Sequence, residues 1–211
     1  MQSLQQTIIR RDSWEVEPRL KELDLTSSGI RRVRDVALAA RNHVTGFHAA
    51  NAAGTLAYQD GVWCLRDEFV GDVWKMDRPG GIEAISNLSI RARIAFANVD
   101  RCCDDSHSPT PISEKGSAAE QLCEGNLFGT LPTYAKQQTS LGIPLFYCMV
   151  DPEGRVELSR PTIEGKTFGP CVERNYISNG PDDDDDGRKK SIDPLDQSAV
   201  ELTPTITRKA A

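Results

Sequence analysis

The stretch LSIRARIAFA, residues 88–97, decides the fold that we expect of this chain. Its apolar side chains stand at every second position from Leu88 to Phe96, which is the spacing of a β-strand with one buried face. The positions between them begin polar, with Arg91 and Arg93. This spacing is absent earlier in the chain, so the strand separates two halves of different character.

The half before this strand has helical spacing. Apolar residues recur every three or four positions from Ser27 or Ser28 to Phe47, as on the buried face of an amphipathic helix. Residues 55–72 follow the same spacing, although Gln59-Asp60-Gly61 would also suit the turn of a hairpin. We expect a second helix there, because the spacing holds over four intervals, with the hairpin as the alternative.

The half after the strand is expected to complete a sheet. Residues 101–140 are rich in Ser, Pro and Gly, with a helical turn or two near residues 118–123. A hairpin is predicted over residues 145–160, with its turn at residues 151–154, and a short helix at residues 167–177. The predicted fold class is therefore α+β, with N-terminal helices followed by a small, mainly antiparallel sheet with a C-terminal hairpin and short helix.

One domain is predicted over residues 1–177, helical over about residues 1–75 and strand-rich over about residues 82–177. Residues 178–211 have no aromatic residue and contain five consecutive aspartates, Asp182–Asp186, which is typical of a disordered acidic tail. The tail holds 8 of the 31 acidic and 5 of the 25 basic residues, so the body is nearly neutral. A nearly neutral body argues against a protein that coats nucleic acid by bulk charge.

Composition also argues against membrane and secreted classes. The longest apolar run, Leu145–Val150, is far shorter than the about 20 residues that a membrane-spanning helix needs. The N-terminal residues place two arginines after a short apolar patch, which is the wrong order for a secretory signal. We therefore expect a cytoplasmic protein that has no contact with membrane and keeps its six cysteines reduced.

Residues 100–107 form the densest group of potential metal ligands. Carboxylates, two thiols and an imidazole are donors that zinc or iron prefers, but adjacent cysteines do not match a zinc knuckle. The acidic neighbours raise the pKa of a thiol, which argues against a cysteine nucleophile. We expect a solvated acidic loop and no cofactor. The alternative is a Zn or Mg site with Cys102, Cys103, Asp104 and His107 as ligands.

Asp151 and Glu157 invite comparison with the carboxylates of two-metal nucleases. The residue two positions after Glu157 is Ser159 rather than lysine, and Asp151 begins a Pro-Glu-Gly turn in which aspartate commonly accepts backbone N–H bonds. The sequence therefore leans away from an enzyme. The alternative is a metal-dependent hydrolase or nuclease, with Asp100, Asp104, His107, Asp151 and Glu157 as its candidate catalytic residues.

Arginines border the predicted helix and strand. They would either follow a phosphate backbone or lay their methylene groups over the edge of the core. The candidate nucleic-acid-binding residues are Arg31, Arg32, Arg34, Arg41, Arg91 and Arg93. The expected function is a non-enzymatic cytoplasmic binding or regulatory protein that acts through a protein or nucleic-acid partner, with the acidic tail modulating the contact. Partner identity and oligomeric state stay open at this level.

Overall fold

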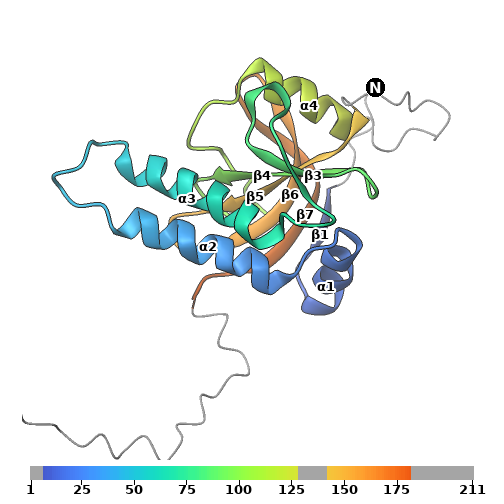
Figure 1. The fold of residues 1–211 in the computed structure, drawn as a ribbon, viewed down its shortest axis with the longest axis horizontal. Coiled ribbons are helices and arrows are strands. Elements are labelled where there is room, and N and C mark those ends of the chain that lie inside the picture. The colour runs from blue at the N-terminus through green and yellow to red at the C-terminus, as the bar shows by residue number, and fades with distance from the viewer. Residues whose placement is uncertain (1–6, 128–141, 182–211) are drawn as a thin grey trace, which may run out of the picture.

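The computed structural model describes residues 7–127 and 142–181, in which the chain forms four α-helices and seven β-strands (Figure 1). The helices are α1 (Ser13–Glu22), α2 (Ser27–Asn42), α3 (Ala52–Phe69) and α4 (Ser117–Leu127). The strands are β1 (Ile8–Arg10), β2 (Lys75–Asp77), β3 (Ala84–Asn87), β4 (Ala92–Asn98), β5 (Leu145–Val150), β6 (Val156–Glu164) and β7 (Thr167–Ser178). A 3-10 turn, η1 (Pro79–Gly81), connects β2 to β3.

The strands form one mixed sheet in the order β1-β7-β6-β5-β4-β3-β2. β1 pairs in parallel with β7, and β4 pairs in parallel with β5, while the other neighbours are antiparallel. The prediction of a small, mainly antiparallel sheet is therefore wrong. A parallel pair needs a long crossover, and the segment between β4 and β5, which carries α4, supplies it.

The predicted short helix at residues 167–177 is also wrong, because these residues form β7. Gly169 and Pro170 would interrupt a helix, whereas a strand accommodates them beside the register shifts of the β6–β7 pairing. β7 has β6 on one side and β1 on the other, so hydrogen bonds with two neighbours determine its conformation. This tertiary pairing decides the conformation of a segment that the sequence alone assigned to a helix.

The strand predicted at residues 88–97 begins later than expected. Residues 88–91 turn the chain from β3 into β4, with Leu88 71% exposed and Arg91 at a φ of 54°. From Ala92 onward the strand is buried on both faces up to Ala97, because helices cover both sides of the sheet. The polar residues that alternate with apolar ones in this stretch therefore occur only at the beginning of the strand.

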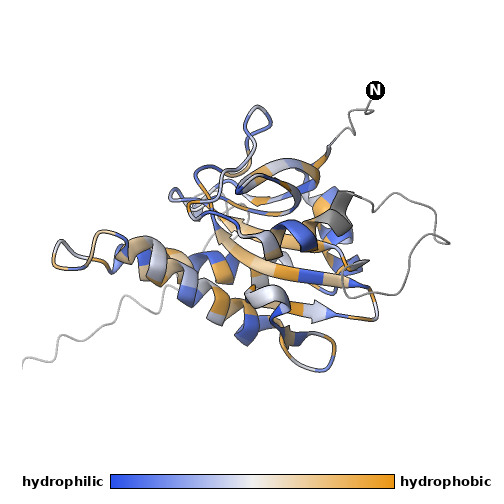
Figure 2. Cartoon of the chain, turned by 90° about the horizontal axis from the view of Figure 1, so that it is seen from above, coloured by the Kyte–Doolittle hydropathy of each residue, from blue (hydrophilic) through white to orange (hydrophobic). Residues whose placement is uncertain are grey.

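Helices cover the two faces of the sheet unequally (Figures 1 and 2). α2 and α3 run side by side over one face, with α1 beside β7, and their apolar residues join those of the sheet in the larger core cluster. α4 covers the other face, where the buried apolar residues form a smaller core cluster. The helix predicted at residues 55–72 is confirmed as α3, and Gly61 lets it approach β4, since a Cβ there would lie 2.5 Å from the Phe96 ring.

The predicted hairpin at residues 145–160 is confirmed as β5, a tight turn and β6, with Gly154 at a φ of 85°. β7 ends at Ser178, which is buried, and the described residues end three positions later. Of the predicted acidic tail, residues 178–211, Ser178 belongs to β7 and residues 182–211 lie outside the described residues. No helix in the described part of the chain combines the length and apolar character that a bilayer crossing requires.

Candidate functional site

The two groups of candidate catalytic residues meet where the central strands end. The loop after β4 carries Asp100–His107, while Asp151 follows β5 and Glu157 lies on β6. The backbone N–H of Cys102 donates to Asp151 Oδ2 at 3.0 Å, and that of Cys103 donates to Glu157 Oε2 at 2.7 Å. The two buried carboxylates thus anchor the loop through its main chain.

Glu157 also forms a buried ion pair with Arg174 of β7, their side chains being 0% and 5% exposed. Arg174 donates from Nε to Oε1 at 3.0 Å and from Nη2 to Oε2 at 2.7 Å, a two-point pairing. Its Nη1 donates to the carbonyl oxygens of Asp104 and His107 at 2.8 and 2.9 Å. Ser159 Oγ donates to Glu157 Oε1 at 2.7 Å, so both oxygens of Glu157 have structural partners.

Asp151 is held in a comparable way by the hairpin turn. Its Oδ1 accepts the backbone N–H groups of Glu153 and Arg155 at 2.9 and 3.0 Å, and the Arg155 guanidinium forms an ion pair with its Oδ2 at 2.9 Å. These are the backbone bonds that the turn interpretation predicts, and that interpretation is confirmed. Asp151 therefore shapes the turn and the neighbouring loop.

The two thiols of the loop have environments that oppose ionisation. Burial, followed by the negative charge of Glu157, raises the pKa of Cys102 and of Cys103 far above the ordinary value. Cys102 Sγ donates to the Met149 carbonyl at 3.3 Å, and Cys103 Sγ lies 3.5 Å from the carbonyl oxygens of Val156 and Ser178. Neither thiol is a thiolate near neutral pH, which is the form that attacks electrophiles or binds metal.

Asp100 and Asp104 are ionised loop residues with partners of their own. Burial opposes ionisation of Asp100, but hydrogen bonds from the Thr110 amide and the His107 ring outweigh it and lower the pKa. His107 Nε2 lies 2.9 Å from Asp100 Oδ2. The hydroxyl and amide of Ser106, together with Arg101, lower the pKa of Asp104 to about 2. Both carboxylates therefore stabilise the loop conformation.

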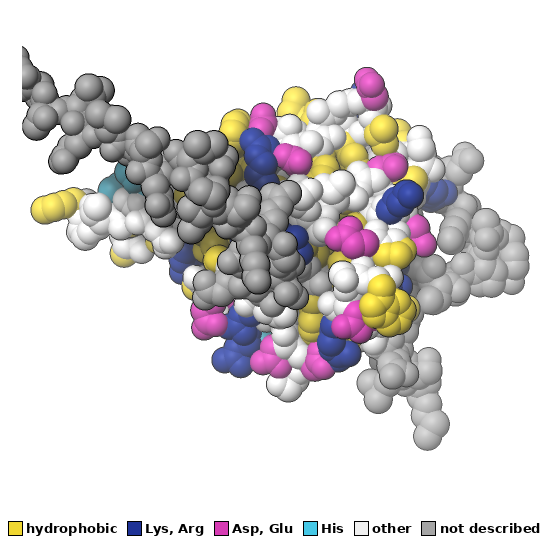
Figure 3. All heavy atoms as spheres, turned by 90° about the horizontal axis from the view of Figure 1, so that it is seen from below, with side chains coloured by type: hydrophobic (Ala, Val, Ile, Leu, Met, Phe, Trp, Pro, Cys, Tyr) yellow, Lys and Arg dark blue, Asp and Glu magenta, His cyan; other side chains and the backbone are white. Residues whose placement is uncertain are grey.

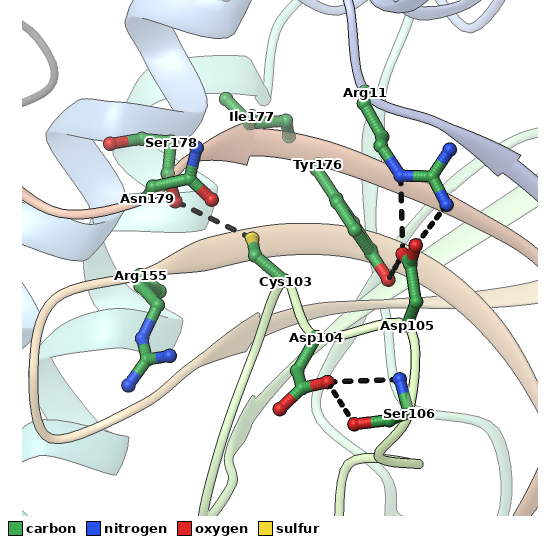
Figure 4. A pocket seen from close by; sticks show the side chains of 10 residues that line it. All are labelled: Arg11, Cys103, Asp104, Asp105, Ser106, Arg155, Tyr176, Ile177, Ser178 and Asn179. Carbon is green, nitrogen blue, oxygen red and sulfur yellow. Dashed lines mark hydrogen bonds and ion pairs between the residues drawn. The ribbon is translucent and has the colours of Figure 1, made fainter.

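A polar cavity of about 510 Å³ opens beside this loop and the end of β7 (Figure 4). Asp105 on its wall accepts a hydrogen bond from the Tyr176 hydroxyl at 3.1 Å and one from Arg11 Nε at 3.2 Å. Arg155 stands on the other side of the cavity, and the Cys103 thiol points toward Ser178. The charged groups around the cavity are paired within the protein.

The structure does not bring the predicted metal ligands together. Within residues 7–127 and 142–181, no three His, Cys, Asp or Glu side chains form a group that would hold a metal ion. Cys102 Sγ and Cys103 Sγ point toward carbonyl oxygens, whereas His107 pairs with Asp100 and Asp104 with Ser106. The geometry therefore lends no support to the Zn or Mg alternative.

The arginines of α2 mostly have partners inside the protein. Arg34 is 2% exposed, donates to Ser178 Oγ at 2.8 Å and pairs with Asp35. Arg31 donates to the Ile177 carbonyl at 3.3 Å. Arg32 bridges two carboxylates of α3, Asp67 at 2.8 Å and Glu68 at 2.7 Å. Arg41 is half-buried near the end of α2.

The two arginines at the start of β4 are engaged as well. Arg93 is buried and donates from Nε to Asp77 Oδ2 at 2.8 Å, while Arg91 donates to the Gly142 carbonyl at 3.4 Å. On the face of the molecule drawn in Figure 3, basic and acidic side chains are interspersed. Five of the six candidate arginines thus have hydrogen-bond or ion-pair partners among the described residues.

A second hollow, which the sequence did not predict, lies between α3 and β2 and has a volume of about 560 Å³. Trp63 of α3 and Met76 of β2 line it while remaining 56% and 66% exposed. Val62, Val70 and the stem of Arg66 complete its lining, together with Gln59 and Asp67. The available signal was Trp63, a large apolar residue one position outside the buried stripe of its helix.

Comparison with protein-family models, with curated proteins and with solved structures finds no match to this chain. Function is therefore inferred from the geometry of this chain alone.

Proposed function

We propose that this chain is a non-enzymatic binding protein that takes an extended segment of a protein partner along the outer edge of β2. The observation that carries the proposal is that Trp63 and Met76 line one groove while more than half exposed. A groove with large exposed apolar side chains is typical of a binding surface, and Trp and Met are enriched where proteins meet. The partner's apolar side chains would fill this groove.

The position of β2 supports an extended partner. β2 is the last strand of the sheet, and in the described residues it pairs with β3 alone. Peptides bind such edges by adding a strand, so that main-chain hydrogen bonds give affinity and side-chain pockets give specificity. The strand is only three residues long and begins with Lys75, features that limit indiscriminate pairing at an edge. Specificity would therefore depend on the groove beside it.

The arginines favour a protein partner over a nucleic acid. Binding to a phosphate backbone gains its free energy from cations that are free to replace counterions. Arg32 and Arg93 pair with carboxylates, Arg34 is buried, and Arg31 is bonded to a backbone carbonyl. Few of the predicted basic residues are thus available to phosphates.

The residues around the polar cavity favour binding over catalysis. A general base or nucleophile must have its reactive atom available to the substrate. The carboxylates of Asp151 and Glu157 are occupied by arginines and backbone amides, and the thiol of Cys103 has a raised pKa. These groups maintain the shape of the cavity.

The cytoplasmic location and the modulatory role of the acidic tail remain parts of this proposal. All six cysteines are free thiols, five of them buried, which suits a reducing compartment. Pro181 and Leu38 of α2 both lie against Gly154, and Asp182–Asp186 follow directly in the sequence. We propose that the charge of these aspartates discourages acidic partners.

The test is a selection of short peptides from a displayed random library with the full chain as target. Selected peptides should have apolar residues at alternate positions, as a strand beside β2 requires. Calorimetry should show at least a roughly tenfold loss of affinity in Trp63→Ala and in Met76→Ala, because truncating a central apolar anchor removes much of the binding free energy.

Trp14→Ala is the matched control, since Trp14 of α1 is 72% exposed but lies outside the groove. It should bind the selected peptides as the parent does. Peptides that bind both groove variants with parental affinity would refute the proposed site. Replacing Asp182–Asp186 by Asn should strengthen the binding of acidic peptides at low salt. Replacing Asp193 and Asp196, which lie farther along the sequence, by Asn should strengthen it less.

A further inference from the structure

A third cavity lies apart from both regions described above. It has a volume of about 230 Å³ and lies between η1, the beginning of α4 and aromatic side chains of α3, β4 and β5. Its aromatic wall consists of Tyr58, Phe96 and Tyr147. Gly80 allows η1 to pack closely on α4, because a Cβ at this position would lie 2.6 Å from the Ala118 Cβ.

Lys115 lines this cavity, and its surroundings differ from those of the other lysines that the structure describes. Its Nζ lies 5.3 Å from the centroid of the Tyr147 ring and 5.0 Å from that of Phe168. The adjacent carboxylate, Glu114, also lines the cavity but pairs with Lys166, with an N–O distance of 3.0 Å. In the part of the chain that the structure describes, no carboxylate forms an ion pair with the Lys115 ammonium.

Burial lowers the pKa of Lys115 to about 8, because the ammonium has lost water without gaining a carboxylate. Aromatic faces compensate a cation only in part. Lys115 is half-buried, and a partly desolvated cation gains most from an anion at hydrogen-bond distance, for which the cavity beside it has room. Its volume is below the about 300–1,000 Å³ of pockets for drug-sized ligands, so the ligand must be small.

We propose that this cavity binds a small aromatic carboxylate, whose carboxylate group pairs with the Lys115 ammonium and whose ring packs against Tyr58, Phe96 and Tyr147. The aromatic wall selects a flat apolar body, and the single cation selects one negative charge. This site is independent of the proposed peptide groove, with which it shares no lining residue.

The experiment is a titration of the full chain with benzoate, followed by NMR of the lysine side chains. Benzoate should bind saturably and raise the pKa of Lys115 toward its ordinary value. Affinity should fall as the pH rises above about 8, because the unbound ammonium then loses its proton. Benzamide, which has the same shape without the charge, should bind at least about tenfold more weakly.

Lys115→Met should weaken benzoate binding at least about tenfold, while Lys115→Arg, which keeps the positive charge, should retain part of the affinity. Lys166→Met is the control, because Lys166 is an exposed lysine that already pairs with Glu114. A melting curve confirms that each variant is folded. Absence of saturable benzoate binding, or binding that is the same in Lys115→Met and the parent, overturns the proposal.

Discussion

The pair formed by Glu157 and Arg174 should be the most costly single interaction to break in the described structure. Arg174→Met removes two hydrogen bonds to Glu157 and two to the loop carbonyls of Asp104 and His107. It leaves a carboxylate with 0% exposure and no cation beside it. Removing one partner of a buried ion pair costs about 3–5 kcal/mol, which lowers the melting temperature of a domain of this size by about 6–20 °C.

Scanning calorimetry measures this loss, and amide hydrogen exchange locates it. The Cys103 amide, which donates to Glu157, should exchange faster in Arg174→Met. The control is Arg11→Met, whose partner Asp105 is half exposed, so its melting temperature should barely change. Glu157→Leu combined with Arg174→Leu should melt above Arg174→Met, because neither charge is then buried alone. A melting temperature for Arg174→Met within about 2 °C of the parent would refute this reasoning.

Three further results are expected. Gly61→Ala should lose about 1–2 kcal/mol of unfolding free energy in urea, because its Cβ would lie 2.5 Å from the Phe96 ring. Gly54→Ala, which lies in open space on the same helix, should gain about 0.5–1 kcal/mol. Equal effects of the two substitutions would contradict the packing of α3 on β4. Lys115→Met should be more stable than the parent at pH 7, and this advantage should shrink in melts between pH 8 and 10.5, because the folded parent releases its proton at about 8 and the unfolded chain at 10.5. Asp104→Asn should be less stable than the parent at pH 6, and this difference should vanish as the pH falls through about 2. The reason is that the lowered pKa of Asp104 stabilises the folded chain only while its carboxylate is ionised. A stability difference that does not depend on pH would contradict this role of the ionised carboxylate.

The helices and the hairpin could be predicted because their signals are local. Three- and four-residue spacing identifies α2 and α3, and the turn after Asp151 has residues that suit a hairpin. The sheet could not be predicted in the same way, since its order depends on partners far apart in the chain. β1 and β2 are three residues long, too short to show any period, and β7 is defined by its two neighbours.

The candidate site shows the same division between local and long-range information. The sequence identified residues 100–107, Asp151 and Glu157 as candidates because of their side-chain chemistry. In the structure, the loop is joined to the two carboxylates through its backbone amides, which every residue has and which a sequence therefore does not reveal. Arg174 was missed because its segment, now β7, was expected to be a short helix. The sequence placed Arg32 and Arg34 on the borders of an apolar stripe of α2, whereas Arg34 is buried and these arginines find partners on α3 and β7.

The pairing of β1 with β7 has a consequence for the order in which the chain folds during synthesis. Ile8 lies opposite Glu173, and Arg10 lies opposite Asn175, so the first described strand can pair only after the last one, β7, has been made. At about 5–20 residues per second, a ribosome needs many seconds to translate the intervening chain. Until β7 emerges, β6 has an open edge and Arg19 lacks the carboxylate of Glu173. The nascent chain therefore exposes a strand edge to chaperones and to neighbouring chains until synthesis passes residue 178.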